Sequence, residues 1–145
     1  MLNGKLRLAT IEGDQKQFVA MSGGGHSFVV DTEDGNTGAR PVELALLAVG
    51  ACTAMDIISI LRKKRQPVTG YEVELSAEQR EEYPQTFTKV TIKHKLRGKI
   101  DPEAVNRAIE LSETKYCSVG AMIAKSAKIV ASFEIAQDGS EVGNE

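Results

Sequence analysis

The chain has 145 residues, with 18 basic and 20 acidic side chains and a formal net charge of −2 at pH 7. One domain of this length buries roughly 68–70% of its unfolded surface, so we expect a single domain over residues 1–137 and a polar tail over 138–145. The balanced charge argues against a nucleic-acid partner, and the lack of an apolar leader or a long apolar run predicts a soluble, cytoplasmic protein with no membrane partner.

The first third of the chain has the pattern of short strands. Alternating apolar and polar residues predict strands over 5–11, 18–22 and 27–32. The run of three glycines at 23–25 lacks the strand, motif and helix context of a dinucleotide-binding loop, so a turn explains it better. We therefore expect an antiparallel meander.

A long helix is predicted next, from Pro41 to about Arg65. Glu43 lies in its first turn and a basic run over 62–65 lies at its end, which suits the helix dipole. Residues 44–55 are apolar on nearly every side, which is typical of a helix that is buried all round. Because one small sheet cannot cover such a helix, we expect a homodimer with this helix at or near the interface.

Two strands with one apolar and one charged face follow, over 71–80 and 87–97. One charged face is acidic and the other is basic. We expect the strands to pair antiparallel around a turn at 83–84, because that register places Glu74 opposite Lys93. A slip of one residue would turn the apolar side chains out of the core.

The rest of the chain predicts two helical segments and a last strand. Asp101 and Pro102 are typical of a helix N-cap and first position, so a helix is expected through about Ser112. A short helical stretch follows Cys117, and alternation over 129–135 predicts the final strand.

Cys52 and Cys117 are the only cysteines of the chain. Two cysteines are too few for a disulfide scaffold, which favours a reduced or cycling pair over a permanent bridge. On composition alone, buried cysteines that act as small apolar residues are the more common case. A redox pair instead needs one thiolate that attacks an oxidant and a second thiol nearby that completes a disulfide.

The motifs around these cysteines carry a resemblance. The order of elements, the Pro-x-Glu-Leu helix with Gly-Ala-Cys, the hairpin and the Tyr-Cys-Ser segment resemble the OsmC/Ohr superfamily (osmotically induced protein C and organic hydroperoxide resistance). The resemblance implies an α+β fold with antiparallel sheets around a long central helix in an intertwined homodimer. It also implies a thiol peroxidase in which Cys52 attacks an organic hydroperoxide and Cys117 resolves the intermediate. A dithiol such as a dihydrolipoyl protein would restore the thiols, without a metal or another cofactor.

The chain departs from the peroxidase pattern at the start of the helix. Characterised hydroperoxide reductases of the superfamily have a glutamate directly after the proline, and an arginine in an early strand-turn region. Here Val42 follows Pro41, and Glu43 comes one position later, which rotates its side chain by about 100° around the helix. Glu43 stays the third candidate catalytic residue. The candidates for a substitute cation are Arg7, Arg40 and Arg80.

Two further polar residues lie in apolar segments. Asp56, four residues after Cys52, shares its helix face and could oppose a thiolate or hold an arginine. His94 lies on the apolar strand face, where a general base is possible and a satisfied core histidine is more common. A zinc site formed by the cysteines with His26 and His94 lacks any metal-binding spacing, so no metal is expected.

Two classes of function follow from the sequence. The first is a hydroperoxide reductase that works through the Cys52 and Cys117 pair. The alternative is a non-catalytic dimer that binds an apolar ligand or senses oxidants through the same thiols. If the thiols act as a peroxidase pair or as an oxidant sensor, the two cysteines should lie within disulfide reach, which requires Cα atoms roughly 4.4–6.8 Å apart.

Overall fold

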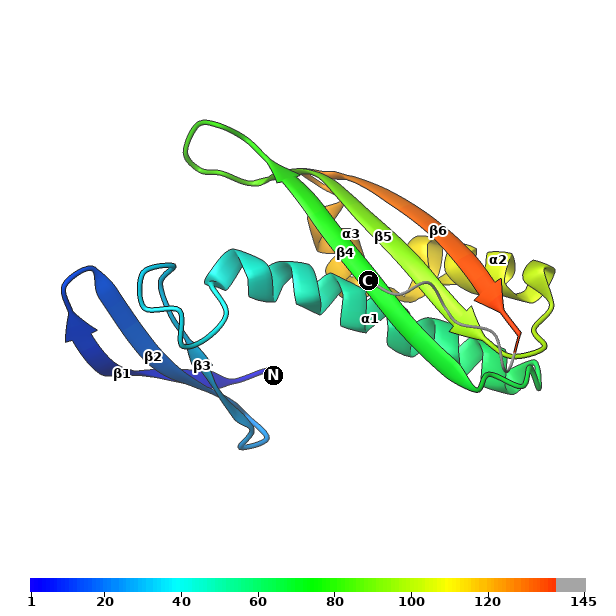
Figure 1. Ribbon diagram of the computed structural model, residues 1–145, viewed down its shortest axis with the longest axis horizontal. Coiled ribbons are helices and arrows are strands. Elements are labelled where there is room, and N and C mark those ends of the chain that lie inside the picture. Colours follow the sequence, from blue (N-terminus) through cyan, green and yellow to red (C-terminus); the bar gives the residue numbers. More distant parts are fainter. Residues whose placement is uncertain (138–145) are drawn as a thin grey trace. The chain divides into compact units, whose positions relative to one another are not determined.

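A computed structural model describes residues 1–137, and the tail predicted over 138–145 lies outside them. The chain divides into two compact units, Met1–Ala45 and Leu46–Glu145. Figure 1 shows a sheet in each unit and helices in the second, so the predicted α+β fold is confirmed. Helix α1 (Pro41–Lys63) contributes residues to both units. The single domain over 1–137 stays a prediction.

The first unit is an antiparallel meander, as predicted. Strands β1 (Gly4–Glu12), β2 (Gln15–Ser22) and β3 (Ser27–Val30) pair in chain order. The glycine run forms the turn between β2 and β3, and its last residue, Gly25, has a left-handed φ of 88° that favours glycine.

Asp31 organises the loop that leads from the first sheet toward α1. This residue is buried, and its carboxylate accepts hydrogen bonds from the side chains of Gln15 and Thr37 and from the backbone of Thr32. The bond from Thr37 is the main cause that lowers the pKa of Asp31 to about 2. The loop is therefore fixed around a carboxylate that stays ionised.

The second sheet has the order β4-β5-β6, with β4 (Gly70–Gln79), β5 (Phe87–Arg97) and β6 (Lys128–Ala136). Strands β4 and β5 pair antiparallel with Glu74 opposite Lys93, so the predicted register is confirmed. The ion pairs are shifted by two residues along the strands: Glu74 binds Lys95, whereas Lys93 binds Glu134 on β6 at 3.4 Å.

Strand β6 corrects the expectation that the sheets are antiparallel throughout. The strand lies where the sequence predicts it, but it pairs parallel with β5. The connection between β5 and β6 contains α2 (Pro102–Leu111), η1 (Ser112–Tyr116) and α3 (Ser118–Ile123). A crossover that contains helices is long enough to return the chain to the same end of the sheet, which a short turn cannot do.

Helices α1 and α2 cover one face of the second sheet (Figure 1). One cluster of buried apolar residues joins the two helices to β5 and consists of Ile57, Leu61, Leu96, Ile100, Ala104, Val105, Ala108 and Ile109. A second cluster surrounds the cysteines and consists of Val49, Val90, Ile92, Cys117 and Ala127. Gly50 lets α1 approach the sheet, because a Cβ atom there would lie 2.4 Å from Leu75 Cδ1.

The prediction that α1 is buried all round is wrong for this chain by itself. Its buried residues lie on one face, while Leu47 and Met55 are 55% and 67% exposed. The physical reason is that one three-stranded sheet and α2 cover one side of the helix. Among the described residues, α1 is long and apolar enough to cross a membrane, with a mean hydropathy of 2.2 over its most apolar window. The core helix of a soluble protein meets the same criterion.

Candidate functional site

The two cysteine sulfurs lie close together in the second unit. Cys52 lies in the middle of α1, and Cys117 lies directly before α3. The two Sγ atoms and a carboxylate oxygen of Asp56 all lie within 4.8 Å of one another, and both thiols are free. The two sulfurs therefore lie close together, as the sequence predicts. The Cα separation that a disulfide requires stays a prediction.

The chain before and after Cys117 fixes the position of its sulfur. Cys117 donates its backbone N–H to the carbonyl of Ser112 at 2.8 Å, at the end of the π-helical turn η1. Its Sγ accepts the backbone N–H of Gly120 at 3.2 Å and thereby caps α3. A Cβ atom at position 120 would lie 2.9 Å from this sulfur, so the cap requires glycine. π-Helical turns are frequent at functional sites.

Burial distinguishes the two thiols. Cys117 is only 6% exposed, whereas Cys52 is partly exposed. Burial is the main cause that raises the pKa of Cys117 to about 11, and the hydrogen bond with Cys52 and the charge of Asp56 act in the same direction. The N–H of Gly120 acts against them. Cys117 is therefore a neutral thiol near pH 7, and Cys52 is the more accessible sulfur.

Asp56 is held by a hydroxyl pair that the sequence does not reveal. Ser112 donates its hydroxyl to the Asp56 carboxylate at 3.0 Å. Because a serine has one hydroxyl proton, Thr53 is the donor in its 2.8 Å contact with Ser112. Both hydroxyl residues are buried. The predicted position of Asp56 beside Cys52 is confirmed, and its partner is a serine of η1 in place of an arginine.

Among the described residues, Cys52, Asp56 and Cys117 form a group that could hold a metal ion. Two thiolates and one carboxylate suit Zn²⁺, which takes four ligands in a structural site. This group differs from the four-residue set considered from the sequence, because Asp56 replaces both histidines. Within residues 1–137 the group offers three ligands.

His94 lies in a cavity beside Cys117. The side chain is fully buried, and its Nδ1 atom shares a 2.7 Å hydrogen bond with the hydroxyl of Tyr71. Burial lowers the pKa of His94 to about 4, so the imidazole is neutral near pH 7. Its Nε2 atom has no hydrogen-bond partner within residues 1–137. The expectation of a satisfied core histidine is therefore correct for one ring nitrogen only.

The cavity itself has a volume of about 180 Å³. Its walls come from α1, β5, η1, α3 and β6, and its lining residues are Val49, Thr53, Ile92, His94, Glu113, Cys117, Gly120, Ala124, Ile129 and Ala131. Most of this lining is apolar. Burial also raises the pKa of Glu113.

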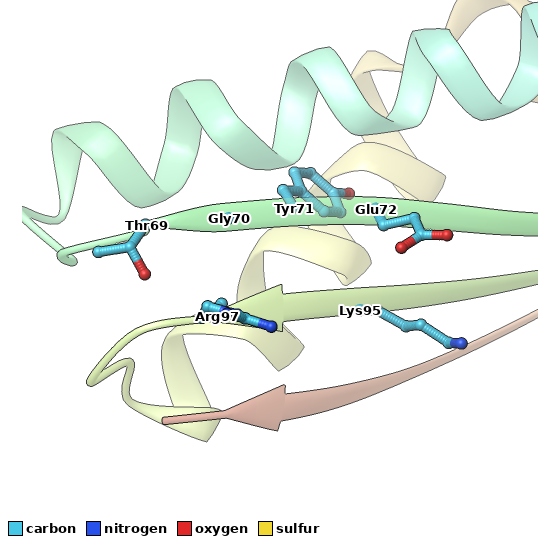
Figure 2. Close-up of a pocket in the computed structure, with 6 residues that line it drawn as sticks. All are labelled: Thr69, Gly70, Tyr71, Glu72, Lys95 and Arg97. Carbon is cyan, nitrogen blue, oxygen red and sulfur yellow. The ribbon is translucent and has the colours of Figure 1, made fainter. Parts of the chain in front are cut away.

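A second hollow lies where β4 begins and β5 ends (Figure 2). It has a volume of about 330 Å³ and is lined by Thr69, Gly70, Tyr71, Glu72, Lys95 and Arg97. The ring of Tyr71 points from β4 toward α1, whereas Glu72 and Lys95 point away from that helix. No cysteine lines this hollow, so we assign it no part in thiol chemistry.

Glu43 pairs with a neighbouring arginine at the start of α1. It binds Arg40, which also contacts Glu33 at 3.5 Å, and the bond to Glu43 is the main cause that raises the pKa of Arg40. These three residues belong to the first unit. Arg80 contacts Glu82 at 3.8 Å. The catalytic role of Glu43 stays a prediction.

Sequence reasoning missed Thr53, Ser112 and Tyr71. A signal existed for Tyr71, because the predicted register places it diagonally across from His94, within reach of a long side chain. No signal marked the serine or the threonine, since their contact joins residues 59 positions apart.

Comparisons with known proteins agree with this fold. The chain is 39% identical to Protein YhfA of Escherichia coli strain K12 over 130 residues, which are 89% of this chain and 96% of that protein. A hypothetical protein from Aquifex aeolicus is 30% identical, with a TM-score of 0.84 over 95% of this chain and 98% of the other. The organic hydroperoxide resistance protein OhrB of Bacillus subtilis is 13% identical, with a TM-score of 0.66 over 92% and 98%. That last likeness shows the fold alone.

The family described as OsmC-like protein matches residues 33–132. These residues contain α1 with Cys52, the β4–β5 hairpin and the segment of Cys117. The match covers more than half of the chain and both thiols. The chain belongs to the OsmC-like family.

Proposed function

We propose that the protein is a cytoplasmic, cysteine-based peroxidase that reduces organic hydroperoxides. The observation that carries this proposal is the position of two free sulfurs within 4.8 Å of each other, one partly exposed and one buried. Two cysteines that only filled space in the core would both be buried, whereas Cys52 is partly exposed.

Cys52 performs the first step because its sulfur is the more accessible one. Its thiolate attacks one oxygen of R–O–O–H, the O–O bond breaks, and the products are Cys52–SOH and an alkoxide that takes up a proton to give R–OH. The sulfur is oxidised by two electrons and the peroxide is reduced by two. No metal or flavin is needed.

Cys117 completes the cycle as the resolving thiol. It condenses with Cys52–SOH to form a disulfide and release water. Its raised pKa keeps the proton on this sulfur until the sulfenic acid forms. A dithiol reductant, such as a dihydrolipoyl protein, then exchanges with the disulfide, which restores both thiols and leaves the reductant as a disulfide.

Glu43 is the third residue that we propose for catalysis, with Arg40 as its ionic partner. Their contact at the start of α1 supports this proposal. Glu43→Gln should lower kcat/KM for the hydroperoxide by roughly tenfold or more. Glu33→Gln, which alters the other contact of Arg40, is the matched control and should have little effect.

A homodimer is also proposed. Exposed apolar residues of α1, such as Leu47 and Met55, support it, because a second copy could bury them. Light scattering at micromolar concentration should give twice the mass of one chain, and the mass of a single chain would contradict this part of the proposal.

The decisive experiment is a turnover assay with cumene hydroperoxide and dihydrolipoamide. We expect peroxide-dependent loss of the dithiol, complete loss of this activity in Cys52→Ser and normal activity in Ser126→Ala, which changes an exposed serine outside the site. If the parent protein consumes no dithiol above background while its thiols remain reduced, the non-catalytic alternative is correct. That alternative, binding of an apolar ligand, is favoured by the cavity beside Cys117.

A further inference from the structure

The unpaired ring nitrogen belongs to His94, which lines a cavity with mostly apolar walls. The side chain is fully buried, so Nε2 cannot reach bulk solvent, and no described residue bonds to it. More than nine in ten buried polar groups in proteins have a partner, so an exception calls for an explanation. The atom belongs to a residue that lines a cavity of about 180 Å³. A molecule in that cavity would supply the missing partner.

The size and lining of the cavity define the molecule that fits. An apolar cavity of about 150 Å³ in another protein holds benzene, so this one suits a compact group of about six or seven carbon atoms. The walls beside Val49, Ile92, Ile129 and Ala131 favour an apolar body. An anionic ligand is disfavoured, because the lining contains the carboxyl group of Glu113 and no lysine or arginine.

The chemistry of His94 restricts the polar end of that molecule. Tyr71 holds Nδ1, and the neutral imidazole then presents Nε2 as a donor in one tautomer and as an acceptor in the other. A hydroxyl or hydroperoxyl group both donates and accepts, so it satisfies either tautomer. An ammonium group only donates, and a carbonyl group only accepts.

We propose that this cavity is a binding site for a compact apolar molecule with one hydroxyl or hydroperoxyl group, which bonds to His94 Nε2 beside Cys117. The evidence for the binding site is the cavity and the unpaired nitrogen. Its use for a hydroperoxide or its alcohol product rests on the proposed function. In that case the oxygen is bound in the cavity that Cys117 also lines, and the sulfur of Cys117 is within 4.8 Å of Cys52 Sγ.

Phenol and toluene are the matched probes, because they are similar in size and only phenol carries a hydroxyl group. The chain has two histidines, so nitrogen-15 labelling gives two resolvable rings, and His26 is an exposed internal control. Phenol should shift the Nε2 resonance of His94 and leave that of His26 unchanged. By calorimetry the parent protein should bind phenol about tenfold more tightly than toluene, which corresponds to one hydrogen bond.

Two substitutions of His94 distinguish the roles of its two ring nitrogens. His94→Asn keeps a polar atom near the position of Nδ1 and removes Nε2, so the preference for phenol should disappear. His94→Gln keeps a polar atom near the position of Nε2, so the preference should remain. Tyr71→Phe removes the partner of Nδ1 alone and should also retain the preference, which keeps the test valid if His94→Asn fails to fold.

Equal affinity of the parent protein for phenol and toluene would overturn the proposal. So would an unchanged His94 resonance at saturating phenol, which would mean that water satisfies Nε2. Phenol should also raise the KM for tert-butyl hydroperoxide, whose four carbon atoms fit this cavity, without changing kcat. Phenol binding by Cys52→Ser, together with no turnover by the parent protein, would support this site and reject the proposed reaction.

Discussion

Ser112 donates its hydroxyl to the carboxylate of Asp56 at 3.0 Å and thereby ties η1 to the helix that carries Cys52. The serine also accepts a hydrogen bond from Thr53 at 2.8 Å. One buried hydroxyl therefore fixes the distance between the two cysteine segments. Its effect can be measured as stability and as the rate of disulfide formation.

Ser112→Ala should lower the free energy of unfolding by about 1–3 kcal/mol, because the carboxylate and the threonine hydroxyl lose a buried partner. Urea denaturation of the reduced protein measures this change. Ser126→Ala, in which the lost hydroxyl is exposed, should change stability by less than about 0.5 kcal/mol. Equal effects of the two substitutions would contradict the structural role of Ser112.

Oxidation should consume both thiols together. One equivalent of cumene hydroperoxide should remove Cys52 and Cys117, because attack at one sulfur is followed by condensation with the other. Cys52→Ser should leave Cys117 mostly reduced, and Cys117→Ser should trap a sulfenic acid on Cys52. Thiol counting with mass spectrometry tests the assignment, and equal reactivity of the two sulfurs would argue against it.

Alkylation of Cys117 should depend strongly on pH. Its folded pKa is about 11, against an ordinary value of 9.0, so its reaction with iodoacetamide should stay slow at pH 8 and accelerate toward pH 11. The protonated thiol favours the folded state, so this contribution to stability is complete below pH 9 and is lost as the pH rises from about 9 to 11.

Asp56→Asn should shift this alkylation profile toward lower pH, because it removes a negative charge that raises the pKa of Cys117. Asp34→Asn, in the first unit, is the matched control and should leave the profile in place. Peptide mapping by mass spectrometry distinguishes Cys117 from Cys52. An identical profile in both variants would contradict the influence of Asp56.

The buried imidazole of His94 should make the protein sensitive to acid. Its pKa is about 4 in the folded state and 6.5 ordinarily, so the unfolded state takes up the proton first as the pH falls. The contribution of the neutral imidazole to the free energy of unfolding should be fully present above pH 6.5. The free energy of unfolding should decrease by at most about 3 kcal/mol as the pH falls to 4. His94→Gln should flatten this dependence, whereas His26→Gln should preserve it. Thermal unfolding across this pH range measures both.

Gly50→Ala should destabilise the second unit by about 1 kcal/mol, because the added Cβ atom would lie 2.4 Å from Leu75 Cδ1 and displace this side chain, at a cost that exceeds the gain of roughly 1 kcal/mol from alanine inside a helix. Leu75→Ala in the same chain should recover part of this loss. Gly24→Ala, where the nearest atom lies 3.6 Å away, is the control. Calorimetric melting temperatures compare the four proteins, and an unchanged value for Gly50→Ala would refute the close approach.

Local patterns in the sequence determined most of the secondary structure. Strict alternation along β4 and β5 placed their apolar faces, and the acidic and basic faces specified the register with Glu74 opposite Lys93. Asp101 and Pro102 marked the start of α2, and the structure confirms the cap. These signals are local because the side chains that carry them are neighbours along a strand or a helical turn.

Only the tertiary structure decided the pairing of β6, the half-covered α1 and the surroundings of the site. Parallel pairing depends on the path of a crossover, and the coverage of α1 depends on how much sheet packs against it. The link between Asp56 and Ser112 joins residues 56 positions apart. The Nε2 atom of His94 is unpaired because none of the described segments around it offers a hydrogen-bond partner. Such contacts depend on the packing of distant segments, which no local pattern of residues encodes.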